Sequence, residues 1–307
     1  MSEDMRNRFA AVTNELLDTD ERVAIVLADI SGDKFQEARK KHPLRRINVG
    51  IREQVLVNVG AGMALAGMRP IVHTFAPFLV ERAFEQIKLG FAHQGVGGVL
   101  VSIGGSYDVP AYGRTHQSTG DVALMATLPD VRIHVPGHAD EAEAFLRDAV
   151  ASEDLVYIRL SGASNAAPQT GTAHASTSGE LTILRRGSDD APTVVAVGPM
   201  LDRVLEATAE IDATVLYAAT VRPFDAAGLR EHMTGDSVAL VEPYLEGTSA
   251  AEISAALSHR AHRLLSIGVP RTEHRRYGSA ADHDRAHGLD PSGLRARIEA
   301  WLQPVAA

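Results

Sequence analysis

A carboxylate, Glu53, stands where a strand pattern gives way to a helix pattern. The β-type run from Arg45 to Val49 ends at Gly50, and a helix-type run begins at once with Glu53 in its first turn. Open α/β sheets bind ligands at the carboxyl ends of their strands, so an acid here can exchange a proton with a bound ligand. The alternative role is structural, because the helix dipole favours a carboxylate in the first turn.

Further residues able to bind a ligand follow other predicted strands. Asp29 comes directly after the apolar run 22–28, where it is either a ligand-binding residue or a helix cap. Phe75 and Phe78 follow the predicted strand 70–73. Two aromatic rings at this spacing either orient a flat ligand or pack into the core.

A long loop over residues 104–119 contains a histidine, His116, within the run Gly113-Arg114-Thr115-His116-Gln117. Neutral imidazole can accept or donate a proton near neutral pH. The chain has 13 histidines, so the residue type alone does not identify a site. The surrounding motif is the informative feature.

Alternating strand and helix patterns surround these residues. In the first half, the expected strands are 22–28, 45–49, 70–73, 97–103, 131–135 and 155–160, and the expected helices are 3–18, 51–66, 77–93 and 140–150. In the second half, the main expected strands are 193–197, 213–217 and 237–241, and the final expected helix is 291–302. This alternation predicts two α/β domains with doubly wound, mostly parallel sheets.

A change in composition divides these two patterns. Residues 161–179 are rich in Ala, Ser, Thr, Gly and Gln and have no periodicity, which is typical of a linker. We therefore predict a first α/β domain over 1–162, a linker over 163–190 and a second α/β domain over 191–307.

Composition and charge exclude several classes of function. The chain of 307 residues has no cysteine, which excludes disulfides, thiolate metal sites and a cysteine nucleophile. Its net charge of -9 is unfavourable for binding nucleic acid. No apolar run is long enough to cross a membrane, and the polar start of the chain has no signal-peptide core, so a cytoplasmic location is expected.

Several of these motifs occur together in one known family. They are Arg46 to Gln54, Thr74-Phe75-Ala76-Pro77-Phe78, Gly113-Arg114-Thr115-His116-Gln117, Thr220 to Asp225 and Val241-Glu242-Pro243. In this order they resemble the C-terminal half of transketolases and of 1-deoxyxylulose-5-phosphate synthases. The resemblance runs from the region of Asp20 to the C-terminus and implies a pyrimidine-binding domain followed by a transketolase C-terminal domain.

The resemblance implies a thiamine diphosphate site. The family glutamate that matches Glu53 hydrogen-bonds N1′ of the aminopyrimidine and so favours the tautomer that generates the reactive ylide. Phe75 and Phe78 match the aromatic residues that pack on the pyrimidine, and Asp29 matches an aspartate near the cofactor. His116 matches the histidine that faces the cofactor and the sugar.

Two departures from the family set further expectations. The chain has no Gly-Asp-Gly followed by an Asn-containing segment, which is how the family holds Mg²⁺ and the diphosphate, so no metal ligands are assigned to it. The N-terminal half of a full transketolase is also missing. We therefore expect a separate N-terminal, diphosphate-binding subunit that carries Mg²⁺, in an α2β2 assembly.

A further departure concerns the substrate loop. Gly104-Gly105 replaces a family His-Asp pair and Tyr112 replaces a family aspartate, which changes the contacts available to sugar hydroxyls. Tyr112, Arg114 and Arg159 are the candidate substrate-binding residues, with a surface ion-pair role left open for both arginines.

These observations favour the pyrimidine-binding subunit of a split transketolase-like enzyme in specialised metabolism. Such an enzyme moves a two-carbon ketol unit from a ketose to an aldehyde. One alternative is the β subunit of a 2-oxoacid dehydrogenase, although Thr115-His116-Gln117 differs from the Gln-His-Ser typical there. A second alternative is a non-catalytic interface partner. Asp225 and Glu242 are expected at inter-domain or interface contacts, and the segment Arg271 to His287 is either a subunit contact or a solvated loop.

Overall fold

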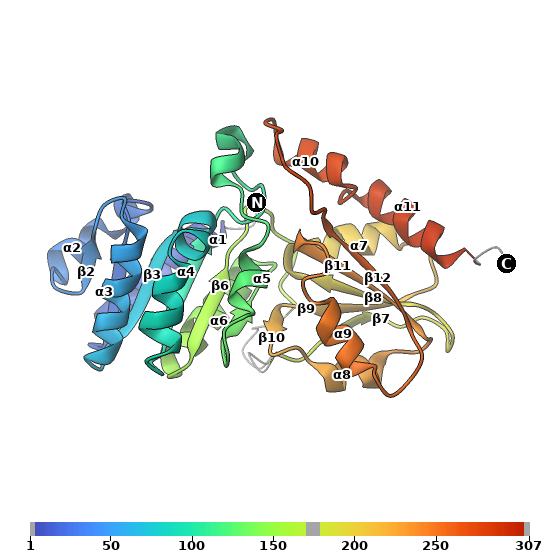
Figure 1. Cartoon of the computed structure of the whole chain (residues 1–307), viewed down its shortest axis with the longest axis horizontal. Coiled ribbons are helices and arrows are strands. Elements are labelled where there is room, and N and C mark those ends of the chain that lie inside the picture. The colour runs from blue at the N-terminus through green and yellow to red at the C-terminus, as the bar shows by residue number, and fades with distance from the viewer. Residues whose placement is uncertain (1–3, 170–178, 304–307) are drawn as a thin grey trace.

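The computed structural model describes residues 4–169 and 179–303. Two α/β domains lie side by side along the long axis of the molecule (Figure 1). The first contains a seven-stranded sheet with the order β10-β5-β6-β4-β3-β1-β2, and the second a five-stranded sheet with the order β12-β11-β8-β9-β7. Within the described ranges, every helix is too short or too polar to span a lipid bilayer.

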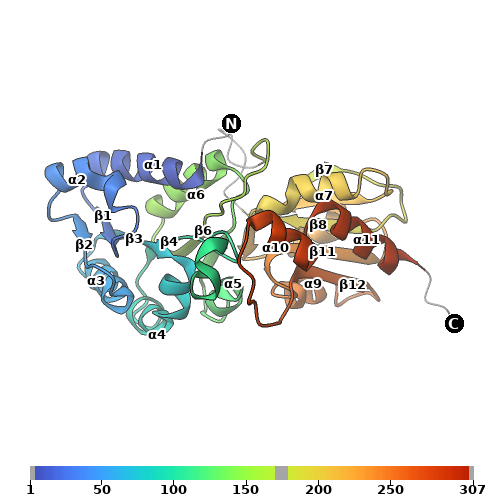
Figure 2. The ribbon, with the colours of Figure 1, turned by 90° about the horizontal axis from the view of Figure 1, so that it is seen from above.

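The first sheet is buried because helices cover both of its faces. Its strands are β1 (Val23–Leu27), β2 (Arg46–Asn48), β3 (Arg69–Phe75), β4 (Gly98–Ile103), β5 (Arg132–His134), β6 (Leu155–Arg159) and β10 (Thr220–Arg222). Helices α1 (Met5–Thr19) and α6 (Ala139–Ala151) cover one face, and α3 (Glu53–Leu65), α4 (Phe84–Gln86) and α5 (Asp121–Met125) cover the other (Figure 2). The apolar run of β1 is buried throughout, as expected for a central parallel strand.

The second domain repeats this arrangement. Its strands are β7 (Thr182–Arg185), β8 (Thr193–Val197), β9 (Thr214–Ala218), β11 (Ser237–Leu245) and β12 (Arg263–Val269). Its helices are α7 (Leu201–Ala207), α8 (Ala226–His232), α9 (Ala250–Ala256), α10 (Ala280–His287) and α11 (Pro291–Leu302). All pairings are parallel except β10 with β5 and β7 with β9. The predicted fold class, two mostly parallel α/β domains, is confirmed.

Short helical segments connect several of these elements. They are α2 (Gln36–Lys41), the 3₁₀ segments η1 (Gly32–Phe35), η4 (Pro110–His116) and η5 (Gly198–Met200), and the π-helical segments η2 (Pro77–Glu81) and η3 (Ile87–Ala92). The expected single helix 77–93 is therefore wrong in detail. A π-helical turn is typical of a functional site, and η2 carries one of the two predicted ligand-facing phenylalanines, Phe78.

The predicted linker, 163–190, also differs from the structure. Residues 182–185 form β7 and pair antiparallel with β9, so they belong to the second sheet. The short run was not recognised because its residues are only partly buried and carry no clear alternation. Residues 170–178 of the predicted linker lie outside the described residues.

The two domains share structural elements. Strand β10 comes from the second half of the chain but pairs antiparallel with β5 of the first sheet, where Thr220 lies opposite His134. The Thr220 hydroxyl also lies 2.9 Å from Nδ1 of His134. Because this strand completes the first sheet, the domain boundary is not a single point along the chain.

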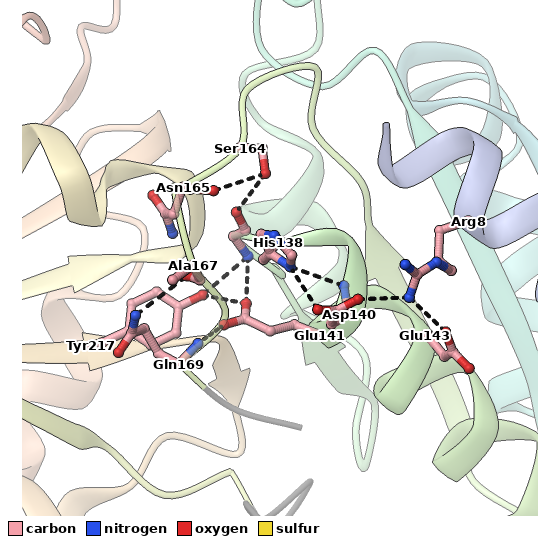
Figure 3. A network of polar contacts seen from close by, with 11 residues as sticks. Arg8, His138, Asp140, Glu141, Glu143, Ser164, Asn165, Ala167, Gln169 and Tyr217 are labelled. Atoms are coloured by element: carbon pink, nitrogen blue, oxygen red, sulfur yellow. Dashed lines mark hydrogen bonds and ion pairs between the residues drawn. The ribbon is translucent and has the colours of Figure 1, made fainter. Parts of the chain in front are cut away.

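A buried carboxylate forms a second connection between the domains. Figure 3 shows Glu141 of α6 at the centre of a polar network. Glu141 accepts hydrogen bonds from the Tyr217 hydroxyl of β9 at 2.6 Å and from the backbone N–H groups of Gly137 and Gln169, both at 2.7 Å. All these donors converge on a side chain with no solvent exposure, so the network fixes how the second sheet docks on α6.

Replacing Tyr217 with phenylalanine tests this connection. The change removes a buried donor between the domains, so we expect a loss of about 1–2 kcal/mol in the free energy of unfolding, measured by urea denaturation. The same change at the exposed Tyr277 is the matched control and should have almost no effect. Equal losses of unfolding free energy at the two positions would contradict a specific role of Tyr217 in connecting the domains.

The two C-terminal acids that were expected at interfaces lie inside the second domain. Asp225 caps α8 by accepting from the Gly228 N–H at 2.8 Å. Glu242 is fully buried and accepts from the Ser249 N–H at 3.0 Å. Burial raises the pKa of Glu242 from 4.5 to about 7. Asp225 Oδ2 also accepts from the Leu181 N–H, next to β7, at 2.9 Å. Within this chain both acids therefore accept hydrogen bonds from backbone groups of the second domain, and their contact with a partner chain stays a prediction.

The raised pKa of Glu242 predicts a pH-dependent stability. Between pH 4.5 and about 7 the folded chain holds a proton that the unfolded chain has released. Stability must therefore fall as pH rises through this window, by up to about 3 kcal/mol from this group. A Glu242→Gln variant should lose this slope in urea denaturation series at several pH values. An unchanged slope would show that other groups cause it.

Candidate active site

Glu53 is the first residue of α3 and lies just beyond the carboxyl end of β2. The turn between them passes through Gly50, whose φ of +72° is in the left-handed region that favours glycine. The Glu53 side chain is only 3% exposed, and its Oε2 accepts from Arg82 Nη1 at 2.9 Å. Within the described residues this ion pair uses Oε2, which leaves Oε1 as the carboxylate atom available to a ligand.

Arg82 connects Glu53 to the aromatic residues. Its guanidinium carbon lies 4.2 Å from the ring centroid of Phe78, in cation–π geometry, while 43% of its side chain is exposed. Arg82 was not among the site residues predicted from the sequence motifs. The available signal was its position four residues after Phe78, but such a spacing is common on surface helices and does not by itself indicate a site.

The predicted aromatic residues and the loop histidine form one cluster. The His116 ring centroid lies 5.4 Å from that of Phe75, 5.0 Å from that of Phe78 and 4.7 Å from that of Tyr112. Burial, and then the positive charge of Arg82, lowers the pKa of His116. The imidazole is therefore neutral at neutral pH, the form that can accept a proton. Residues that are far apart in the sequence, Phe75 and Phe78 after β3 and His116 in the long loop, therefore lie close together in the fold.

Packing explains the two glycines that replace the family His-Asp pair. A Cβ at Gly104 would lie 2.6 Å from Cδ1 of Phe75, and Gly104 also has a φ of +68°. A Cβ at Gly105 would overlap the guanidinium of Arg159. Side chains at these positions are therefore incompatible with the placement of Phe75 and Arg159.

Both candidate substrate-binding arginines have carboxylate partners. Arg159 is fully buried, and its Nε donates to Asp121 Oδ2 at 2.7 Å. Arg114 is half exposed, and its Nε lies 3.2 Å from Glu273 Oε1 in the second domain. The surface ion-pair alternative therefore describes Arg114, whereas it is wrong for Arg159, because the ion pair of Arg159 with Asp121 is buried. Their binding of substrate stays a prediction.

Asp29 lies at the same edge of the sheet as Glu53, after β1. It is exposed, and its Oδ1 accepts from Asn48 Nδ2 at 2.9 Å. Asn48 Oδ1 in turn accepts from the N–H groups of Asp29, at 3.0 Å, and Gly50, at 3.1 Å. Ser31, not Asp29, occupies the N-cap of the following helix η1. Asp29 therefore supports the turn that presents Glu53, and its contact with a cofactor stays a prediction.

The residues present fit the pyrimidine end of thiamine diphosphate. A buried carboxylate, aromatic rings and a neutral imidazole share one cluster, and a flat heterocycle with a ring nitrogen suits such a set. In the part of the chain that the structure describes, there is no group of three or more His, Cys, Asp or Glu residues that could hold a metal ion. The cluster therefore offers a carboxylate, aromatic rings and an imidazole to a flat ring, and the placement of a metal ion stays a prediction.

The fold and this cluster define the pyrimidine-binding class of chain found in thiamine-dependent enzymes. Residues 2–165 match the family model described as transketolase, pyrimidine binding domain, and residues 179–294 match transketolase, C-terminal domain. The chain therefore belongs to the transketolase family.

Known proteins of similar length support this assignment. The chain is 46% identical over 303 residues to an uncharacterized 33.6 kDa protein in the fasciation locus of Rhodococcoides fascians, covering 97% of this chain and 95% of that protein. It is 29% identical over 246 residues to a 6-deoxy-6-sulfo-D-fructose transketolase subunit of a Clostridium species, covering 78% and 75%. A solved split gene transketolase, described as an inactive β4 tetramer, superposes with a TM-score of 0.82 at 26% identity and 98% coverage of both chains.

The ion pair between Arg82 and Glu53 predicts a measurable coupling. Arg82→Gln leaves a buried carboxylate without its cation and should cost about 1–2 kcal/mol of unfolding free energy, a value limited by the exposure of Arg82. The double variant Arg82→Gln/Glu53→Gln buries no charge and should be less destabilised than Arg82→Gln alone. Urea denaturation measures both.

The exposed Arg39 supplies the control, because Arg39→Gln should not change the stability. Additive losses in the double variant would show that the two side chains do not interact in solution.

Proposed function

We propose that this chain is the pyrimidine-binding subunit of a two-chain transketolase-like enzyme, which transfers a two-carbon ketol unit from a ketose donor to an aldehyde acceptor. The observation that supports it most directly is the buried Glu53 carboxylate, connected through Arg82 to the cluster of Phe75, Phe78 and His116. Membership of the transketolase family supports the same conclusion.

Each side chain has a role that its surroundings support. Glu53 holds a proton against the pyrimidine ring nitrogen through Oε1, because its Oε2 is engaged by Arg82. Phe75 and Phe78, whose rings lie edge to face at 6.1 Å, orient the ring of the cofactor. His116 stays neutral and exchanges protons with substrate hydroxyls. Thiamine diphosphate supplies the carbanion sink when it is bound.

A second polypeptide is part of this proposal. The Clostridium relative is by name a subunit, and the matched solved structure comes from a split gene transketolase. We propose that the partner is an N-terminal subunit that holds the diphosphate and Mg²⁺, that activity depends on it, and that the pair assembles as α2β2. A cytoplasmic location remains a prediction.

The substrates are proposed to be sugars outside the common sugar-phosphate set. Gly104 and Gly105 offer no side chain to a hydroxyl, and Tyr112, 59% exposed, lies beside the His116 ring where the family has an acid. A loop without these polar groups favours a different hydroxyl pattern, because an unmatched buried hydroxyl is costly. This supports a role in specialised metabolism.

Replacing Glu53 with glutamine tests the function. The amide cannot share a proton with the ring nitrogen, so turnover should fall by about 10²–10⁴-fold in the assembly reconstituted with the partner chain. Turnover is measured as ketol transfer over a panel of ketoses, with pyruvate and other 2-oxoacids included to detect decarboxylase activity. Size-exclusion chromatography should show an unchanged assembly.

The exposed Glu37 provides a matched control, since Glu37→Gln removes a surface carboxylate that pairs with the exposed Lys40, and it should leave turnover intact. Full activity of the Glu53→Gln assembly would contradict the proposed role of Glu53. Decarboxylation of 2-oxoacids without ketol transfer would favour the dehydrogenase alternative, and assembly without any turnover in the unmodified chain would favour the non-catalytic one.

A further inference from the structure

The segment between β12 and α10 belongs to the second domain but reaches the loop that carries His116. Both overall views show it beside the η4 region of the first domain (Figures 1 and 2). Glu273 of this segment pairs with Arg114. The Tyr277 ring occupies the space beside Gly113, where a Cβ would lie 2.6 Å from Cε1 of Tyr277. The segment predicted as a subunit contact or solvated loop therefore contacts the substrate loop of its own chain.

A pocket of about 170 Å³ opens between this segment and α10. We call it the histidine pocket, because it is lined by His274, His283 and His287 together with Arg275 and Arg276. His287 lies 5.0 Å from His274 and 5.9 Å from His283, measured between ring centroids. The pocket is distinct from the cluster around Phe78, and none of its residues takes part in the proposed mechanism.

The histidine side chains of this pocket have unused hydrogen-bonding groups. His283 is 1% exposed, stacks on Tyr107 with centroids 5.0 Å apart, and neither of its ring nitrogens has a hydrogen-bond partner among the described residues. His287 Nε2 is also buried without a partner. A buried polar group without a partner is costly, so these nitrogens indicate a ligand that can accept a hydrogen bond.

The charges around the pocket favour an anion. The nearby acids are already paired: Glu273 with Arg114, Asp282 with Arg285, and Asp284 with Arg203.

By contrast, the side chains of Arg275 and Arg276 have no carboxylate partner within residues 4–169 and 179–303. Guanidinium groups of this kind bind phosphate and similar oxyanions in bidentate geometry.

The protonation state of the histidines suits a donor role. Burial, and then the charges of His274, His283 and Arg276, lowers the pKa of His287 to about 4. Burial also lowers the pKa values of His274 and His283. Each ring is therefore neutral at neutral pH and has one N–H to donate.

We propose that the histidine pocket binds a phosphate-like oxyanion, held by the guanidinium groups of Arg275 and Arg276 and by ring N–H groups of His283 and His287. The oxyanion is either the charged end of a substrate or a free anion that acts as an effector. Only the first source rests on the proposed function. Because Glu273 lines the pocket and also pairs with Arg114, an occupied pocket is coupled directly to the loop that carries His116.

Titration of the chain alone with inorganic phosphate tests this site without cofactor or partner. Histidine ring resonances measured by NMR should show saturable shifts of His283 and His287. Arg276→Ala should weaken the affinity by about tenfold or more, since it removes a charge-assisted contact. His283→Phe keeps an aromatic ring against Tyr107 but removes the N–H, and it should also weaken binding. Arg39→Ala, at an exposed arginine of α2, is the control and should have no effect.

Two results would overturn the proposal. One is that the ring resonances of His283 and His287 show no saturable shift as inorganic phosphate is added. The other is that Arg276→Ala and Arg39→Ala bind phosphate equally well. Either result leaves the proposed function intact, because that function is tested by Glu53→Gln in the reconstituted assembly.

The reconstituted enzyme then distinguishes the two sources of the anion. If the site holds the substrate's charged end, Arg276→Ala raises KM for phosphorylated ketoses and leaves KM for uncharged ketoses and kcat unchanged. If it holds an effector, inorganic phosphate changes turnover of charged and uncharged ketoses alike, and Arg276→Ala abolishes that response. Either pattern supports the site.

Discussion

The contact between Arg82 and Glu53 is the constraint around which this end of the molecule is arranged. A carboxylate that is almost fully shielded from water needs a cation or a proton, and here a half-exposed arginine supplies the cation. The left-handed turn at Gly50 and the start of α3 set the position of the acid, while the arginine directly follows the π-helical segment η2 after β3. Two strand ends must therefore keep their register for the pair to form.

The loop that carries His116 is shaped by its neighbours on every side. Phe75 and Arg159 leave room only for glycine at positions 104 and 105, and at position 113 a φ of +65° favours glycine. The Thr119 carbonyl also accepts from the Leu245 N–H of β11 at 2.8 Å. The second domain is therefore part of the frame that positions the candidate site, although it contributes none of the residues first proposed for catalysis.

Sequence patterns with a local physical cause predicted the corresponding elements correctly. Buried parallel strands such as β1 and β8 appear as unbroken apolar runs, and Pro291 marks the start of α11. The fold class and the transketolase resemblance are confirmed. Strands β7 and β10 were missed because each is short and pairs only through tertiary contacts. Arg82 and the ion pair of Arg159 with Asp121 were also missed, because the two residues of each pair lie far apart in the sequence.

Because β10, from the second half of the chain, completes the first sheet, the protein cannot be divided between its two domains without exposing a sheet edge. Any fragment that ends after β6 would lack the strand that covers β5, leaving a row of open backbone N–H and C=O groups along that margin of the sheet. Such a fragment should self-associate through strand addition and not behave as an autonomous unit. The two halves of this chain should therefore be expressed and refolded together, as one polypeptide.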